Sequence, residues 1–152
     1  MTKPKTPDSP NSNVVWLIDI ARFQRNEASG APMMITFFDT ASHLPISSEV
    51  SLAPAGSIAA LVVVDDVSGA LIEHPLFNGA PNGRELKNLL ESFFEKHGTP
   101  SAIRTDNSPL FASAEVVQLL SARGIRHEPC GPDKPGAMRK AERIIRGLRN
   151  RE

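Results

Sequence analysis

Helices and short strands alternate along the second half of the sequence, and this alternation limits the possible folds more than any other feature. Apolar side chains recur at helical spacing over residues 84–97 and 114–123. Short strands are expected at 102–105 and 125–128, and a last helix over 137–150. A helix between two strands carries the chain back to the edge where the first strand began, so such strands pair in parallel.

The first half of the sequence contains three successive strand-like segments. Residues 14–23 and 33–38 are rich in β-branched and aromatic side chains, and 44–52 alternates more weakly. The segment 55–67 is open to two interpretations: a helix that begins after Pro54, or a strand, since it contains a Leu-Val-Val-Val run. The whole order predicts an α/β fold with a mixed sheet and helices on its faces.

One domain accounts for most of the chain. Its 152 residues are enough for a single substantial core. Residues 1–13 are mainly Lys, Pro, Ser, Thr and Asn, so we expect a flexible tail or linker there and one domain over 14–152. The single cysteine, Cys130, excludes an internal disulfide and a zinc site built from cysteines. No apolar run approaches the roughly 18 residues of a membrane span, so no membrane partner is expected.

The charge is unevenly distributed. The formal net charge is zero, which by itself argues against a nucleic-acid partner. However, residues 134–151 hold seven basic residues and one acid, Glu142, so this segment carries +6 and the remainder −6. A neutral total therefore hides a basic C-terminal segment attached to an acidic body.

Three acids lie at positions that are typical of catalytic or ligand-binding residues. Asp19 interrupts an apolar strand, where an unpaired carboxylate costs free energy. Asp106 ends a strand just before a turn, a frequent ligand position in α/β sheets, and Glu142 is the only acid on the basic last helix. Carboxylates gathered from separate elements are ligands for hard divalent cations. Two such ions, about 3.5–4 Å apart, promote reactions of phosphodiesters.

The residues around these acids resemble the motifs of a known family. Trp16 precedes Asp19 by three residues, as in the first motif of that family. Residues 97–107 (HGTPSAIRTDN) resemble the second motif, a Gly-x-Pro turn and then a strand that ends in Asp-Asn. Glu142 lies in an Ala-Glu-Arg sequence that resembles the Glu-Arg signature of the last helix, and 35 residues lie between Asp106 and Glu142.

On these motifs the chain resembles the catalytic core of the DDE transposases and retroviral-type integrases over roughly residues 14–149. The resemblance implies a ribonuclease H-like fold, whose five-stranded mixed sheet has three antiparallel strands and then two parallel ones, with helices on both faces. It implies that Asp19, Asp106 and Glu142 are catalytic and bind Mg²⁺ or Mn²⁺, as two ions.

The long first gap indicates a branch of this family. Asp19 and Asp106 are separated by 86 residues, which is similar to the layout of bacterial transposases of the Mu and Tn552 type. In that layout the strand at 33–38 pairs beside the first acid and 55–67 forms the first helix. Asp39, at the end of an apolar run, is a rival for the position of first acid.

The basic last helix is the expected DNA contact. Arg143, Arg146 and Arg149 recur every three residues after the glutamate, and Lys140 lies just before it. The same spacing also fits a solvated helix face. The resemblance implies element ends and target DNA as partners, a homo-oligomer in the full-length protein, and a cytoplasmic, nucleoid-associated location.

The implied reaction is hydrolysis of a phosphodiester at the element end, followed by joining of the 3′-hydroxyl to target DNA. Two alternatives remain open. The first is a ribonuclease H-like nuclease that cuts without strand transfer, and the second is a DNA-binding or assembly module whose active site has decayed.

Overall fold

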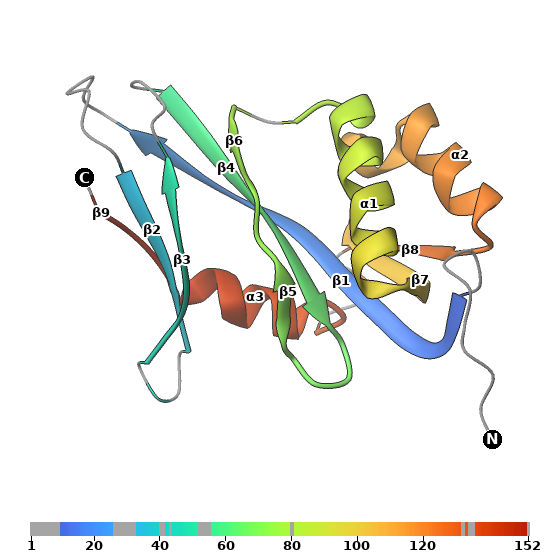
Figure 1. Ribbon diagram of the computed structural model, residues 1–152, viewed down its shortest axis with the longest axis horizontal. Helices are drawn as coiled ribbons and strands as arrows, with labels where there is room; N and C mark the ends of the chain where they lie inside the picture. The colour runs from blue at the N-terminus through green and yellow to red at the C-terminus, as the bar shows by residue number, and fades with distance from the viewer. Residues whose placement is uncertain are drawn as a thin grey trace.

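The structure is a computed structural model, and it describes residues 10–25, 33–39, 42, 44–51, 56–79, 81–131, 133 and 136–151. Over these residues the chain forms two β-sheets and three α-helices (Figure 1). Among them, no helix has both the length and the apolar character needed to cross a membrane.

The main sheet is built around β1 (Pro10–Arg25), a long strand whose residues Leu17 and Ile18 are fully buried. β1 pairs in antiparallel fashion with β4 (Gly56–Asp65) and in parallel with β7 (Thr99–Asp106). A strand with neighbours on both edges and elements on both faces is shielded from water, which explains its nearly continuous apolar sequence.

The outer strands complete the main sheet. β8 (Arg126–Cys130) pairs in parallel with β7, while β5 (Leu71–Glu73) and β6 (Leu76–Asn78) pair in antiparallel fashion with β4. The order β5-β4-β1-β7-β8 contains three antiparallel strands and then two parallel ones, which confirms the predicted mixed sheet. β1 starts at Pro10, four residues earlier than expected, and residues 1–9 of the predicted tail lie outside the described residues.

The segment 55–67 forms β4, so its interpretation as the first helix is wrong. Residues 58–64 are all buried, with exposed fractions of at most 1%. Leu61 packs in the core on one side of the sheet and Val62 in the core on the other, and their neighbours alternate in the same way. Because neither face of residues 58–64 meets water, this stretch has no polar positions, and its sequence lacks the alternation that distinguishes a strand from a helix.

Three further strands form a second sheet, which over the described residues shares no strand pairing with the main one. It consists of β2 (Met33–Phe38), β3 (Pro45–Ser51) and β9 (Leu148–Arg151), in the order β3-β2-β9. The strand character expected for the first two segments is confirmed, but the pairing of β2 beside the first acid is wrong. β4 takes that place, with Val62 opposite Asp19. The β2–β3 hairpin is an insertion between two strands of the main sheet and lengthens the gap between the first two acids.

The helices cover both faces of the main sheet, as predicted (Figure 1). α1 (Gly83–His97) begins at a capping box, in which Asn82 and Glu85 each bond the other's backbone N–H. α1 and α2 (Ala114–Ala122) pack on one face around Trp16, while α3 (Arg139–Arg146) and the second sheet share the other. The core beneath α3 contains Leu17, Ala21, Ile35, Phe37, Ile58, Ala60, Val62, Val64, Met138, Ala141 and Ile144.

α3 is shorter than the helix predicted over 137–150, because the chain turns at Gly147. The N–H of Phe38 donates to the carbonyl oxygen of Gly147 at 2.8 Å. A Cβ atom at Gly147 would lie 1.9 Å from the carbonyl oxygen of Phe38, so only glycine permits this approach of the two backbones. The chain then enters β9, and the expectation that Arg149 continues the basic row on the helix is wrong.

Candidate active site

Asp19 and Asp106 are brought together by the parallel pairing of β1 and β7. Ile18 is the register partner of Thr105, so the next residues along the two strands, Asp19 and Asp106, are neighbours as well. Neighbours in parallel strands project from the same face of a sheet. Leu17, two residues before Asp19, packs in the core beneath α3. The two carboxylates therefore lie on the face that α3 covers.

Glu142 is carried to that face by α3. The helix packs through Ala141 and Ile144, which are both buried against the sheet, whereas Glu142 is exposed at its side. This geometry follows from the sequence, since residues three apart share a helix face and Glu142 lies between them. The third acid therefore faces the solvent beside the first two rather than the core.

The pKa of Asp19 is affected by the charges of the other two acids. Burial raises the pKa of Asp19 above its ordinary value, and the N–H of Ile20, which donates to Oδ1 at 2.8 Å, opposes that effect. The negative charges of Asp106 and Glu142 raise the pKa further. Like charges that affect one another in this way are repulsive, and a bound cation would remove the repulsion.

The three acids suit a hard divalent cation by their chemistry. They offer only oxygen donors, and no basic side chain among the described residues forms a salt bridge with any of them. In the described part of the chain, no three His, Cys, Asp or Glu side chains stand close enough to hold a metal ion as they are placed. Asp106 and Glu142 are exposed, so their side chains have room to change rotamer.

A pocket of about 250 Å³ opens beside Asp106. It lies at the carboxyl end of β7 and is also lined by Arg22, Ser108 and Phe111. The N–H of Ser108 donates to Oδ1 of Asp106 at 3.2 Å, and Ser108 also caps the short 3-10 helix η1 (Pro109–Ala112). The acid therefore stands at the open end of two parallel strands, where α/β sheets commonly bind ligands.

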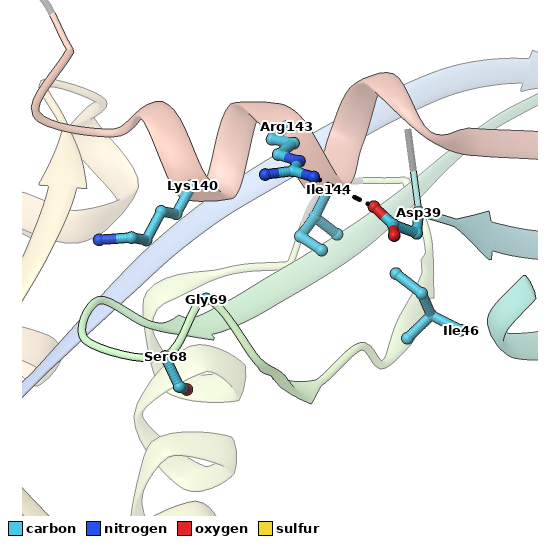
Figure 2. A pocket seen from close by; sticks show the side chains of 7 residues that line it. All are labelled: Asp39, Ile46, Ser68, Gly69, Lys140, Arg143 and Ile144. Atoms are coloured by element: carbon cyan, nitrogen blue, oxygen red, sulfur yellow. Dashed lines mark hydrogen bonds and ion pairs between the residues drawn. The ribbon is translucent and has the colours of Figure 1, made fainter. Parts of the chain in front are cut away.

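Two of the predicted DNA-binding residues are engaged elsewhere. Lys140 donates to the backbone carbonyl oxygen of Asp66 and lies 3.5 Å from its Oδ1, and Nη2 of Arg143 lies 3.3 Å from Oδ1 of Asp39 (Figure 2). Lys140 and Arg143 help to line a second pocket, of about 350 Å³. Successive helical residues are about 100° apart, so Lys140 and Glu142 lie on opposite flanks of α3.

The remaining two predicted DNA contacts lie in different elements. Arg146 is exposed at the end of α3, one helical turn after Glu142. Arg149 lies in β9 and is paired through its backbone with Thr36 of β2. Of these two arginines, only Arg146 lies on the same helix as Glu142.

Asp39, the rival first acid, belongs to a different part of the molecule. It follows β2 of the second sheet, accepts a hydrogen bond from the hydroxyl of Ser42 at 2.9 Å and pairs with Arg143. The pairing of β1 with β7 makes Asp19 a neighbour of Asp106. Asp39 follows β2, which pairs with β3 and with neither of those strands.

Two arginines near Asp106 escaped the sequence interpretation. Arg22 lines the pocket beside Asp106, and Arg104 lies on β7 two residues before it. The signal for Arg104 was present in the sequence: a charged residue two positions from an acid, in a short apolar strand, shares that acid's face. Nothing comparable marked Arg22, because its distance from Asp106 depends on the pairing of β1 with β7.

The solved structures with this fold include retroviral integrases. The simian T-cell lymphotropic virus intasome, solved in complex with the PP2A regulatory subunit B56 gamma, contains a chain with 23% identity and a TM-score of 0.56, which covers 90% of this chain and 37% of that one. The catalytic core domain of HTLV-2 integrase, in complex with magnesium in a dimeric form, has 18% identity and a TM-score of 0.50. The match covers 82% of this chain and 64% of that one. These likenesses confirm the ribonuclease H-like fold.

Sequence comparison indicates the family. An uncharacterized 39.2 kDa protein of insertion element IS476, from Xanthomonas euvesicatoria, is 33% identical over 85 residues, which are 56% of this chain and 24% of that protein. This chain thus spans about a quarter of the length of that relative. The model of the integrase core domain matches residues 9–135, a range that contains Asp19 and Asp106 and ends before Glu142. The chain therefore belongs to the integrase core domain family.

Proposed function

We propose that this chain is the catalytic core of a DDE-type transposase or integrase, a polynucleotidyl transferase in which Asp19, Asp106 and Glu142 are the catalytic residues. One observation carries the proposal. The two aspartates neighbour each other on the two central parallel strands, and the charges of both Asp106 and Glu142 act on Asp19. The proposal is supported by the placement of three acids from three separate elements on one face of the sheet, which hydrophobic packing alone does not require.

The three carboxylates would hold Mg²⁺ or Mn²⁺, as two ions. The magnesium in the HTLV-2 core, which shares the fold, supports this assignment. Ions at this position would activate the attacking oxygen and stabilise the leaving oxygen of a phosphodiester. Asp19 supplies a fixed ligand because it is partly buried and bonded to its own strand, while Asp106 and Glu142 supply ligands that adjust from the solvent side.

The reaction we propose has two steps at one site. Water attacks the phosphodiester at the element end, and the bond to the 3′-oxygen breaks and leaves a free 3′-hydroxyl. That hydroxyl then attacks a phosphodiester of target DNA, and the displaced strand leaves with its own hydroxyl. No protein–DNA bond forms, in agreement with the absence of tyrosine from the chain.

DNA would be held on the solvent side of the site. We assign Arg146 to the phosphate backbone, since it is exposed one turn after Glu142. Arg143, Lys140 and Arg149 remain candidates, with the first two requiring release from Asp39 and Asp66. The intasome and the dimeric and trimeric HTLV-2 cores share this fold, and on that basis we propose a homo-oligomer that acts on DNA. The relative from a Xanthomonas insertion element supports a location at the bacterial nucleoid.

The test compares Asp106→Asn with Asp133→Asn, the same chemical change on an exposed loop residue. Each protein is incubated with Mg²⁺ or Mn²⁺, a supercoiled target plasmid and a duplex that carries a pre-cut element end, and a parallel reaction contains a duplex with the uncut end. We expect joined products with the native chain and with Asp133→Asn, and none with Asp106→Asn. Cutting of the uncut element end without joining would identify the nuclease alternative. The absence of metal binding, cutting and joining in the native chain would overturn the proposal in favour of a decayed module.

A further inference from the structure

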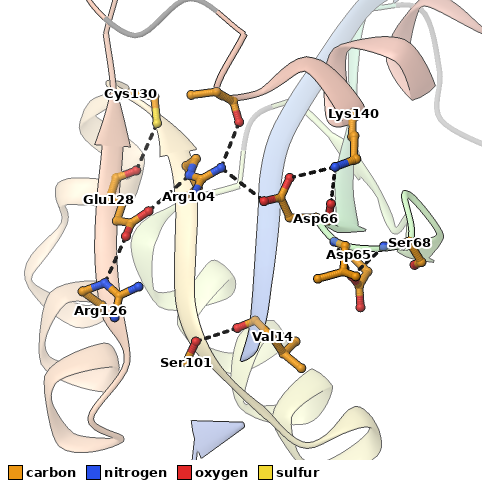
Figure 3. A network of polar contacts seen from close by, with 12 residues as sticks. Val14, Asp65, Asp66, Ser68, Ser101, Arg104, Arg126, Glu128, Cys130 and Lys140 are labelled. Atoms are coloured by element: carbon orange, nitrogen blue, oxygen red, sulfur yellow. Dashed lines mark hydrogen bonds and ion pairs between the residues drawn. The ribbon is translucent and has the colours of Figure 1, made fainter. Parts of the chain in front are cut away.

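A network of charged side chains lies on the α3 face of the sheet, next to the three acids. At its centre is Arg104 of β7, whose Nε lies 3.2 Å from Oε1 of Glu128 on β8. Its Nη1 lies 3.3 Å from Oδ2 of Asp66, which follows β4, and 3.3 Å from the carbonyl oxygen of Ala137, which precedes α3 (Figure 3). The Arg104 guanidinium thus connects β7, β8 and the residue after β4 to the segment just before α3, the helix that carries Glu142.

The network holds α3 at a second point. Asp66 accepts not only from Arg104 but also, through its backbone carbonyl oxygen, from Lys140 in the first turn of α3. Glu128 is held from its other side by Arg126, whose Nε lies 3.0 Å from Oε2. The start of α3 is therefore anchored directly at Ala137 and, through Asp66, at Lys140.

The ion pairs of Arg104 with Asp66 and Glu128 are partly shielded from water, so they can fix the position of the guanidinium. The exposed fractions of the side chains are 25% for Arg104 and 28% for Asp66 and for Glu128. Ion pairs that are partly withdrawn from water are stronger than surface pairs, and a guanidinium fork directs several hydrogen bonds at once. A lysine offers only a single ammonium group and cannot reproduce that fork.

We propose that Arg104 is a positioning residue, which fixes the start of α3 and thereby the place of Glu142 over Asp19 and Asp106. This inference rests on the proposed function, because it assigns the purpose of the placement to the metal site. Glu142 follows the two anchored residues, Ala137 and Lys140, by five and two positions. α3 has only eight residues, so a shift at its start is transmitted to the acid with little loss.

The experiment uses Arg104→Gln, with Arg126→Gln as a matched control. Both changes remove a guanidinium from Glu128, but only the first removes contacts to Asp66 and Ala137. The first measurement is amide hydrogen exchange in α3 and α1 of the metal-free chain. The second is the Mn²⁺ dissociation constant by calorimetry, together with the Mn²⁺ concentration that gives half-maximal strand transfer.

We expect Arg104→Gln to speed exchange in α3 and not in α1, and to raise the Mn²⁺ dissociation constant and the half-maximal concentration by about 10- to 100-fold. We expect Arg104→Lys to lie between this variant and the native chain, and Arg126→Gln to match the native chain in both measurements. Equal behaviour of Arg104→Gln and Arg126→Gln in either measurement would overturn the inference, since a general loss of stability does not distinguish the two.

Two further points keep the outcome decisive. If Arg104→Gln fails to fold, Asp66→Ala removes the side-chain acceptor of Arg104 and tests the same anchor under the same criteria. Faster α3 exchange in Arg104→Gln, combined with a native chain that neither binds Mn²⁺ nor transfers strands, would overturn the proposed function and the metal-positioning role together. Normal metal binding with unchanged α3 exchange in Arg104→Gln would overturn the role of Arg104 alone.

Discussion

Asp19 is placed where a carboxylate lowers the stability of the fold. It is partly withdrawn from water on the central strand, and the charges of Asp106 and Glu142 raise its pKa beyond the effect of burial. A side chain chosen for stability alone at this position would be apolar or neutral. The retention of three mutually repelling acids is therefore most simply explained by a ligand that binds them.

Replacing Asp19 separates stability from function. We expect Asp19→Asn to abolish strand transfer, because the amide is a poor ligand for a divalent cation, and to raise the free energy of unfolding of the metal-free chain by about 1 kcal/mol. Urea denaturation with EDTA present measures the stability, and calorimetry with Mn²⁺ measures the loss of binding. A variant less stable than the native chain would show that the carboxylate serves the fold instead.

At the scale of secondary structure, prediction succeeded where a segment has one solvent-exposed face. The amphipathic spacing of α1 and α2 and the end of β7 at Asp106 were visible in the sequence, whereas β8 runs to Cys130, two residues beyond the strand predicted over 125–128. β4 was not visible, because burial on both faces removes the alternation that identifies a strand. The end of α3 was also hidden, since Gly147 matters through its contact with Phe38, more than 100 residues away in the chain.

That contact at Gly147 leads to a prediction. We expect Gly147→Ala to lower the free energy of unfolding by about 1–3 kcal/mol, because the new Cβ would overlap the carbonyl oxygen of Phe38, which belongs to a paired strand and cannot yield easily. Gly131→Ala is the control, since its Cβ would meet only the side chain of exposed Asp133, at 3.1 Å. Equal losses in the two variants, measured by urea denaturation, would contradict the close approach.

The charged network gives the fold a dependence on pH. Hydrogen bonds from Arg126 and Arg104 hold the pKa of Glu128 below its ordinary value of 4.5. The unfolded chain then takes up the proton first as pH falls, so the stabilisation by Glu128 is fully present above about pH 4.5 and is lost as pH falls through the lowered value. We expect the stability difference between the native chain and Glu128→Gln to shrink below about pH 4.5, as measured by urea denaturation between pH 3 and pH 7. Parallel curves over that range would contradict the ion pairing.

At the scale of the whole molecule, the inserted hairpin is part of the core. Ile35 and Phe37 of β2 are fully buried in the same cluster as Ala141 and Ile144 of α3, so the second sheet and the last helix pack on the main sheet together. Sequence patterns identified the strands of the hairpin but not their location. Strand pairing between distant segments depends on surfaces that no local window contains.

Removing one hairpin side chain tests this integration. We expect Phe37→Ala to lower the free energy of unfolding by about 3–5 kcal/mol, with a single transition for the whole chain, because a fully buried ring leaves a cavity. Ile46→Ala, at a side chain that is 44% exposed, is the control and should change the stability by less than about 0.5 kcal/mol. Two separate transitions would show that the insertion folds independently of the main sheet.

The parallel pairing of β1 with β7 also has a consequence for synthesis of the protein. Ile18 pairs with Thr105, so this residue of β1 is synthesised 87 residues before its partner. At about 5–20 residues per second, that interval lasts roughly 4 to 17 s. Throughout it the nascent chain has Asp19 without its neighbour, and the segment that bears Glu142 is translated later still. A chain whose translation stops before α3 therefore lacks Glu142, so the three candidate acids come together only after the last helix has been made.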